Sequence, residues 1–174
     1  MREKRLVEAA VFLSQEPVKP EELSEKLGIP LERVKEILSQ LVEEYRDRGI
    51  VIRQVAGGYR FFTAPDLHSE LKEFVEDRPI KLSRHLLEVL AIIAYNQPIT
   101  RKEIALIRGQ NPDGAIKSLL EKGLIEVVGR APTPGRPKLY RTTENFLYHF
   151  GLNSISELPE ITLEEEVGEG SGSD

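Results

Sequence analysis

The chain has 174 residues, enough for one ordinary domain or two small ones, and 40% of them are hydrophobic while 30% are charged. This composition is typical of a soluble, packed protein, and because no run of about 18 apolar residues is present, we expect no membrane-spanning segment. The chain has no cysteine, which excludes disulfides, thiolate zinc sites and thiol catalysis and favours a cytoplasmic location.

Charge is distributed unevenly along the chain, although the formal net charge is only −5. Residues 1–78 hold 13 Lys and Arg against 16 Asp and Glu, residues 79–151 hold 11 against 6, and residues 152–174 hold none against 7. A basic segment beside an acidic end is typical of a solvated surface with a solubilising tail, and it is also compatible with an acidic partner.

The first half of the chain is expected to form three helices, a hairpin and a further helix. Apolar periodicity predicts helices at residues 2–14, 20–27 and 31–48, with Gly28 and Gly49 placed to end the second and third. Residues 50–55 and 59–63 read as strands around a glycine turn, and residues 65–76 as a helix. The inner faces expected for the first and last of these helices consist of Leu6, Ala9, Ala10 and Leu13, and of Leu67, Leu71, Phe74 and Val75.

The second half repeats this order after a linker expected at residues 77–81. Ser83 is a good N-cap for a helix that reaches Pro98, and Thr100 with Glu103 forms a capping box for the next helix, which Gly109 ends. A third helix follows up to Gly123, then strands at 125–128 and 138–141 flank a proline-rich loop at 131–137, and a last helix covers 143–150. The inner face expected for the first of these helices consists of Leu86, Leu87, Leu90, Ile93 and Ala94.

The two halves match at a fixed shift of 81 residues. The helix-breaking Pro17 corresponds to Pro98, and the helix-ending Gly28 corresponds to Gly109. These two residue types restrict the backbone, so the match involves more than shared hydrophobicity. We interpret it as an internal duplication of one fold, with a chance match of a few apolar positions as the alternative.

Three helices followed by a two-stranded hairpin are the winged helix-turn-helix order. We therefore predict a mainly α protein with small β wings (α+β), built as tandem winged helix-turn-helix domains. The N-terminal winged-helix domain should cover residues 1–78 and the C-terminal one residues 79–159. Residues 160–174 are rich in Glu, Gly and Ser with little to bury, which predicts an acidic disordered tail.

Residue patterns typical of enzymes and metal sites are missing from the sequence. The histidines at 68, 85 and 149 stand singly in helical patterns, whereas a metal site needs clustered ligands. No nucleophile elbow, phosphate-binding glycine loop or dinucleotide fingerprint is present. We therefore expect no enzymatic activity, no cofactor, no metal and no small-molecule ligand.

DNA binding is the alternative that the fold itself suggests, in the form of a winged-helix transcriptional regulator. The third helix of each half would enter the major groove, but its outer face is mixed to acidic in the first half and nearly neutral in the second. The second wing is better suited to phosphate contact, so we expect DNA contact to be at most weak and nonspecific. Its candidate residues are Arg130, Arg136, Lys138 and Arg141.

Several stretches of the second half resemble one protein family. They are LLEVLAIIAYNQPITRKEI from Leu86, LLEKGLIEVVGR from Leu119, GRPKLYRTT from Gly135, and FLYHFGLNSISELP from Phe146. The family that they resemble is the bacterial segregation and condensation protein B. The resemblance is strong over about residues 82–159, fair over residues 1–78, and absent beyond Ile161.

This resemblance implies a non-catalytic accessory subunit of the bacterial SMC complex, which acts in chromosome condensation, partition and segregation during the cell cycle. Members form homodimers and bind a kleisin, segregation and condensation protein A, which bridges the heads of the SMC ATPase. The implied location is cytoplasmic, and nucleoid-associated through that complex. The positions that the resemblance points to for kleisin contact are Arg108, Gly109, Asp113, Arg130, Arg136 and Pro137.

Three of these positions have a structural reading beside the functional one. Gly109 is placed to end a helix, Pro137 to shape the wing together with Gly135, and Arg108 to pair with Asp113 across a turn. For dimerisation, the expected surface lies on the first helix of the N-terminal domain. There Val7, Val11 and Phe12 fall beside the predicted inner face and widen the apolar surface. One of the neighbouring Phe61 and Phe62 should face away from the main packing side of its hairpin.

Overall fold

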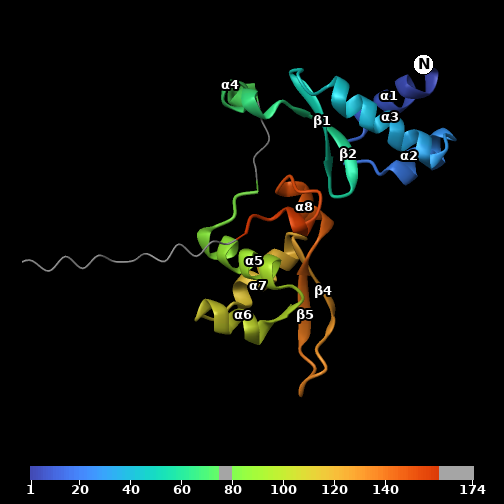
Figure 1. The fold of residues 1–174 in the computed structure, drawn as a ribbon. Coiled ribbons are helices and arrows are strands. Elements are labelled where there is room, and N and C mark those ends of the chain that lie inside the picture. The colour runs from blue at the N-terminus through green and yellow to red at the C-terminus, as the bar shows by residue number, and fades with distance from the viewer. Residues whose placement is uncertain (75–79, 161–174) are drawn as a thin grey trace, which may run out of the picture.

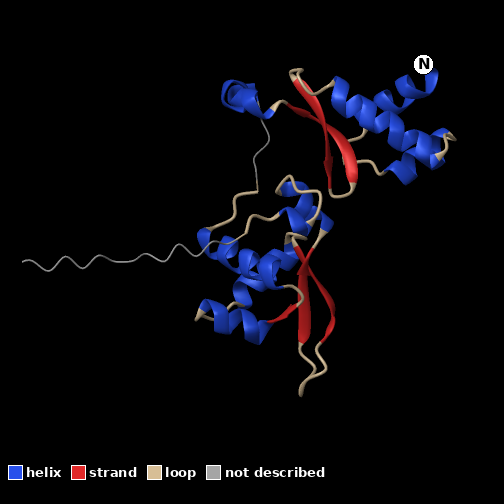
Figure 2. Ribbon diagram, in the orientation of Figure 1, coloured by secondary structure: helices blue, strands red, loops and turns tan. Residues whose placement is uncertain are grey.

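The structure is a computed structural model that describes residues 1–74 and 80–160 (Figure 1). The described chain forms two domains of the same order, each with three helices, a β-hairpin wing and a further short helix (Figure 2). We call residues 1–74 the N-terminal domain and residues 80–160 the C-terminal domain. The boundary expected at residues 78/79, most of the expected linker and the expected tail from residue 161 lie outside the described residues.

The N-terminal domain packs helices α1 (Arg2–Leu13), α2 (Pro20–Leu27) and α3 (Leu31–Glu44) against the antiparallel strands β1 (Ile50–Val55) and β2 (Gly58–Thr63). Proline at the first position of α2 costs no hydrogen bond, and Gly28 ends α2 in the left-handed conformation at φ 66°. The core of this domain consists of Val7, Val11, Val18, Leu23, Ile29, Val34, Ile37, Leu38, Leu41 and Ile52.

The C-terminal domain repeats this arrangement with α5 (Arg84–Asn96), β3 (Ile99–Thr100), α6 (Arg101–Arg108), α7 (Asp113–Glu121), β4 (Ile125–Arg130), β5 (Lys138–Thr142) and α8 (Glu144–His149). Its sheet has the order β3-β5-β4. The predicted caps are confirmed: Ser83 accepts a hydrogen bond from the backbone N–H of Leu86, and Thr100 with Glu103 forms a full capping box. Leu152, Ile155 and Leu158, which follow α8, pack back onto the core.

The backbone pairings support an internal duplication. In the N-terminal domain an antiparallel bridge joins Val18 to Tyr59, and in the C-terminal domain the β3–β5 ladder joins Ile99 to Tyr140. Both partners are shifted by 81 residues. In both domains a residue just before the second helix therefore pairs with the second strand of the wing, as an isolated bridge in one and as the strand β3 in the other. This is a feature of topology and not of hydrophobicity alone.

The inner face predicted for α1 is wrong except at Ala10, which packs against the core. Val7 and Val11 are fully buried in the core, whereas Leu6 and Leu13 are 40% and 78% exposed. Apolar side chains occur around most of this short helix, so periodicity alone does not choose between adjacent faces. As a result, Val7 and Val11 lie inside the domain and cannot form the surface expected of them, and Phe12, at 68% exposure, is the member of that set that remains on the surface.

Three further predictions need correction. Helix α3 ends at Glu44 and not at Arg48, because i→i+3 hydrogen bonds tighten residues 45–48 into turns. The helix predicted at 65–76 is a single α turn, α4 (His68–Leu71), between 3₁₀ turns at Pro65–Leu67 and Lys72–Phe74. Phe74 is 83% exposed instead of inward, and Val75 lies outside the described residues.

The predicted inner face of α5 is right for three of its residues. Leu90, Ile93 and Ala94 are buried, whereas Leu87 is 43% exposed and Leu86 is only partly buried. The periodic pattern missed Val89, which is fully buried.

Candidate partner-binding surface

The turn between α6 and α7 carries three of the positions expected to contact a partner. Gly109 ends α6 at φ 76°, and the side chain of Asn111 accepts a hydrogen bond from the backbone N–H of Asp113 at 3.0 Å. The carboxylate of Asp113 is held by the guanidinium of Arg101, whose Nη2 donates to Oδ2 at 2.9 Å. This hydrogen bond lowers the pKa of the Asp113 carboxyl and raises the pKa of the guanidinium. The expected pairing of Asp113 with Arg108 is therefore wrong.

Arg108 has a different role from the one that the sequence suggests. Its side chain is only 7% exposed, and its guanidinium donates to the backbone carbonyl of Asn111 and to the side chain of Gln110, both at 3.2 Å. The same group contacts Nδ1 of His85, and its Nε lies 3.9 Å from a carboxylate oxygen of Glu88. Arg108 thus joins the start of α5 to the α6–α7 turn and presents little surface to a partner. His85 and Glu88 were not predicted as members of this cluster.

The second wing is shaped by hydrogen bonds within its own loop. The guanidinium of Arg130 donates to the backbone carbonyl of Arg136 at 2.9 Å, and the backbone N–H of Ala131 donates to the carbonyl of Pro137 at 2.8 Å. Arg136 itself has a positive φ of 41°. Arg130 and Pro137 therefore take part in hydrogen bonds that hold the wing loop in shape, while the side chain of Arg136 stays exposed.

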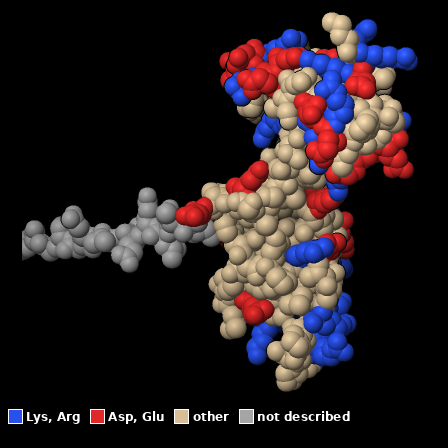
Figure 3. All heavy atoms as spheres, turned by 45° about the vertical axis from the view of Figure 1, so that its right-hand side comes forward, with Lys and Arg blue, Asp and Glu red and all other residues tan. Residues whose placement is uncertain are grey.

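The cations of this wing are only partly available for phosphate contact. Nε of Arg141 lies 2.9 Å from a carboxylate oxygen of Glu126 on the neighbouring strand. Within residues 1–74 and 80–160, no ion pair is recorded for Arg136 or Lys138. On the face seen in Figure 3, Lys and Arg gather at the end of the molecule where the β4–β5 wing lies. Of the four predicted cations, only Arg141 is therefore in an ion pair within the described residues. Arg130 is engaged by the carbonyl of Arg136, which leaves Arg136 and Lys138 as the more available cations of the wing.

Helix α3, in the recognition position of the N-terminal domain, has both of its cations in ion pairs. On α3, Lys35 pairs with Glu32 and Arg33 pairs with Glu36, both at 2.9 Å. Figure 3 accordingly shows acidic and basic side chains mixed over the N-terminal domain. In a groove of duplex DNA such paired cations would have to exchange a carboxylate for a phosphate, and the carboxylates would be repelled.

Two apolar side chains on α6 are strongly exposed and were missed by sequence reasoning. Leu106 is 73% exposed and Ile107 is 56% exposed, whereas Ile104 on the same helix is fully buried. The sequence could have indicated this exposure, because α6 buries only Ile104 and carries two further large apolar residues. Adjacent exposed apolar residues of this size are typical of a docking surface. We call Leu106 and Ile107 the α6 apolar pair.

A cavity of about 310 Å³ opens between the start of α5 and the end of α8. Leu82, just before α5, and Leu87, within α5, are among the residues that line it. Phe150 closes one side and lies 4.8 Å, ring centre to ring centre, from Phe146 in the core. The complete lining consists of Ile80, Leu82, Leu87, Leu124, His149 and Phe150.

The aromatic residues of the first wing separate onto two faces, as predicted. Phe61 packs edge-on against Tyr45 at 5.0 Å and against Phe12 at 6.0 Å. Phe62 points the other way, with the guanidinium groups of Arg53 and Arg60 each 5.8 Å from its ring. Phe12 therefore extends the aromatic cluster of the N-terminal domain to the surface.

Neither a metal site nor a membrane-spanning helix is found in residues 1–74 and 80–160. Among them, no group of three or more His, Asp or Glu is arranged to hold a metal ion. None of the helices in residues 1–74 and 80–160 combines the length and the apolar content needed to cross a membrane.

Comparison with known proteins gives matches over nearly the whole chain. The family described as segregation and condensation complex subunit ScpB matches residues 5–161. A segregation and condensation protein B homolog of Coxiella burnetii is 44% identical, covering 91% of this chain and 78% of that protein. Segregation and condensation protein B of Syntrophotalea carbinolica is 42% identical, covering 94% and 87%. The crystal structure of ScpB from Mycobacterium tuberculosis is 34% identical and covers 86% of this chain and 95% of that chain, with a TM-score of 0.41.

Proposed function

Because this chain belongs to the ScpB family of segregation and condensation complex subunits, we propose that it is a non-catalytic accessory subunit that binds the kleisin of a bacterial SMC complex as a homodimer. The observation that carries this proposal is the family match over residues 5–161. The proposed place of action is the cytoplasm, at the nucleoid, through the kleisin and the SMC ATPase.

The C-terminal domain offers the better docking surface for the kleisin. The α6 apolar pair lies on the outer side of a well-capped helix, and the exposed backbone of Gly109 follows directly. An amphipathic helix of a partner can bury such a pair, with polar contacts at the rim. Of the positions expected from the resemblance, the exposed Gly109, Asp113 and Arg136 stay in the proposal as contacts. The burial of Arg108, and the loop contacts of Arg130 and Pro137, favour supporting roles.

A calorimetric titration with a purified fragment of segregation and condensation protein A tests this proposal. We expect saturable binding to the full chain, and a loss of affinity of about tenfold or more for the Leu106→Glu variant, because a buried apolar anchor becomes a buried charge. Val127→Glu is the matched control, since Val127 is also an exposed apolar residue, 42% exposed, but lies on β4. Absence of binding by the unmodified chain would refute kleisin recognition, and equal losses in both variants would refute the role of the α6 apolar pair.

Dimerisation is proposed for the N-terminal domain, through the face of α1 that carries Phe12. Phe12 is 68% exposed and is backed by Phe61, so it presents a rigid aromatic surface. Burial of such residues at the centre of an interface is typical of binding hot spots.

Sequence-specific DNA reading is not favoured by these observations, since the cations of α3 are paired with carboxylates of the same helix. Weak, nonspecific contact through Arg136 and Lys138 remains part of the proposal. Its signature would be an affinity for duplex DNA that falls steeply with salt and does not depend on sequence. A titration at two salt concentrations with two unrelated duplexes measures both properties.

A further inference from the structure

The turn of the first wing lies against the C-terminal domain. Strands β1 and β2 are joined by Ala56 and Gly57, and this turn meets the segment that follows α8 (Figure 1). The backbone N–H of Ala56 donates to the carbonyl of Leu152 at 3.0 Å. The backbone N–H of Gly57 donates to the side-chain oxygen of Asn153, also at 3.0 Å. Two neighbouring backbone donors of one domain are thus satisfied by the other.

The conformation of the turn explains why these two donors point outward together. Both residues have positive φ, 52° for Ala56 and 79° for Gly57, as in the two-residue turns that suit the twist of a hairpin. Alanine is unfavourable at this φ, where glycine or asparagine is preferred. However, Ala56 also lines a narrow space of about 240 Å³ between the domains, together with Pro17 and Asn145. A small side chain here lets the turn approach the C-terminal domain closely.

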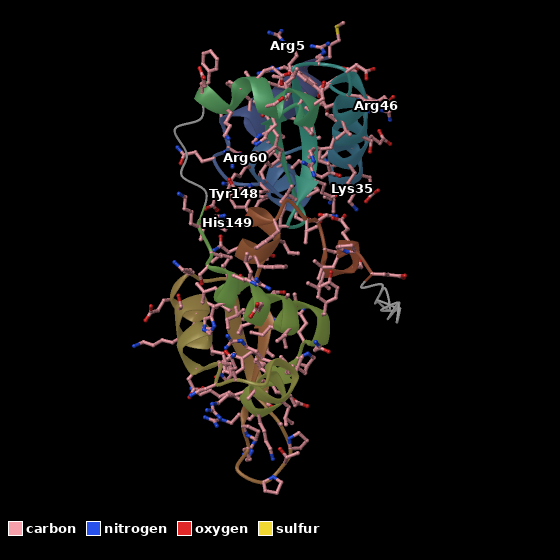
Figure 4. The ribbon with its side chains drawn as sticks, turned by 90° about the vertical axis from the view of Figure 1, so that its left-hand side faces the viewer. Arg5, Lys35, Arg46, Arg60, Tyr148 and His149 are labelled. Carbon is pink, nitrogen blue, oxygen red and sulfur yellow. The ribbon has the colours of Figure 1, made fainter. Side chains whose placement is uncertain are left out.

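Polar contacts on both sides of the turn complete the arrangement. Lys19 pairs with Glu144 at the start of α8 at 2.8 Å. The guanidinium of Arg60 donates to the hydroxyl of Tyr148 and lies 5.5 Å from its ring centre. Figure 4 shows Arg60 and Tyr148 next to each other where the two domains meet. The contacts come from β2 and the loop before α2 on one side, and from α8 on the other.

No shared apolar core supports this interface within the described residues. The core of the N-terminal domain and the core of the C-terminal domain have no residue in common and contain no side chain of the other domain. Lys19 and Glu144 are both largely exposed, so water can replace their contact at little cost. Interfaces of this polar kind between domains hold one orientation while leaving others accessible.

We propose that the Ala56–Gly57 turn is a releasable latch that fixes the orientation of the two domains. Leu152 and Asn153 supply the acceptors of its two hydrogen bonds. In the latched state the α1 face of the N-terminal domain and the α6 face of the C-terminal domain have one relative placement. Release frees the two domains to change that placement without disturbing either core. A partner that touches both domains then selects latched or released chains by its difference in affinity for the two. This inference does not depend on the identity of the partner.

Hydrogen exchange of single amides tests the contact itself. The latch predicts that the amide of Gly57 is protected from exchange in the full chain and loses this protection in Asn153→Ala, which removes its acceptor. The amide of Val18, which donates to Tyr59 within the N-terminal domain at 3.0 Å, should keep its protection in the variant. Loss of protection at both amides, or at neither, would overturn the assignment of Asn153.

Distance measurement between spin labels tests the orientation. The chain has no cysteine, so labels at Ser39→Cys on α3 and Lys117→Cys on α7 are unique, and dilution with unlabelled chain restricts the readout to distances within one chain. We expect one narrow distance population for the labelled chain. The combined variant Lys19→Ala, Arg60→Ala, Asn153→Ala removes the side-chain contacts described above and should broaden it. Circular dichroism should be unchanged because none of the three residues belongs to a core.

Two controls complete the design. Lys26→Ala removes an exposed ion pair with Glu22 within α2, and Ala56→Gly keeps both turn donors while relieving the positive φ. Both should retain the narrow population. A narrow population that survives in the combined variant, or a broad one in the otherwise unmodified chain, would overturn the latch.

Discussion

Arg108 is the most deeply placed charged side chain of the C-terminal domain's turn region. It is surrounded by carbonyl and side-chain acceptors, and yet its Nε has no hydrogen-bond partner in the described structure. An arginine in this position packs its stem as well as its charge. Its contacts join elements that are 23 residues apart in sequence, Arg108 and His85. Arg108 thus holds the α6–α7 turn against the start of α5.

We therefore predict that Arg108→Ala destabilises the chain by about 1–3 kcal/mol, because the packing of its buried side chain is lost. Arg136→Ala, at an exposed position of the wing, should change stability by no more than about 0.5 kcal/mol. Urea unfolding measures both. If the two substitutions had the same small effect, the supporting role of Arg108 would be wrong.

Gly58 is required by close approach. A Cβ added at Gly58 would lie 2.6 Å from the carbonyl carbon and oxygen of Pro17, which are backbone atoms that cannot move aside. Gly58→Ala should therefore cost about 1–3 kcal/mol through overpacking. Gly114 in α7 has no atom within 4 Å of such a Cβ, so Gly114→Ala should be neutral or up to about 1 kcal/mol more stable. Thermal unfolding of the two variants checks the contrast, and similar midpoints would contradict it.

The capping box of α6 makes stability depend on pH in a defined direction. Hydrogen bonds from the hydroxyl of Thr100, at 2.7 Å, and from its backbone N–H, at 2.8 Å, lower the pKa of Glu103. A lowered folded-state pKa stabilises the fold above the unfolded-state pKa of about 4.3, and this stabilisation disappears as pH falls through the folded-state pKa.

Glu103→Gln should accordingly be less stable than the unmodified chain near neutral pH. The difference should stay below about 1 kcal/mol because the side chain is exposed. It should shrink as the pH falls below about 4. Urea unfolding at several pH values measures it, and a difference that grows on acidification would be inconsistent with the capping contact.

At the scale of elements, prediction succeeded where local chemistry fixes a boundary. Thr100 with Glu103 starts α6, and Gly28 and Gly109 end their helices in the left-handed conformation, so these ends follow from short-range contacts. Prediction failed where tertiary packing decides. Helix α1 has apolar residues on several faces, and only the packing against α3 and β2 selects Val7 and Val11 for the core.

The candidate site was predictable in part for the same reason. Its turn and wing could be located from Gly109 and the proline-rich loop. The ion-pair partner of Asp113 could not be predicted, because Arg101 is twelve residues away and reaches Asp113 only after α6 has folded. The burial of Arg108 also depends on His85 and Glu88 of α5, which no local pattern connects to it.

Helix α1 gives a test of the proposed dimer. Phe12→Glu should convert the dimer to a monomer, because a charge replaces an exposed aromatic anchor, with little loss of stability. Val11→Ala should instead cost about 1–3 kcal/mol of stability through a cavity in the core and leave the dimer intact. Sedimentation velocity separates the two outcomes, and a dimer that persists in Phe12→Glu would place the interface elsewhere.

At the scale of the whole molecule, the two copies of one fold expose different surfaces. The N-terminal domain exposes Phe12 and a helix surface of paired charges, and its wing turn is occupied by the other domain. The C-terminal domain exposes the α6 apolar pair and a longer, basic wing. This division suits a subunit that assembles through one domain and receives a partner through the other.

The most direct test of the proposed dimerisation and partner binding is the mass of the particle in solution. Light scattering on the purified chain, alone and with its kleisin fragment at physiological salt, should give twice the chain mass alone and a further gain when the fragment is present. A particle of one chain mass that gains nothing from the fragment would contradict the proposed function at both of its steps.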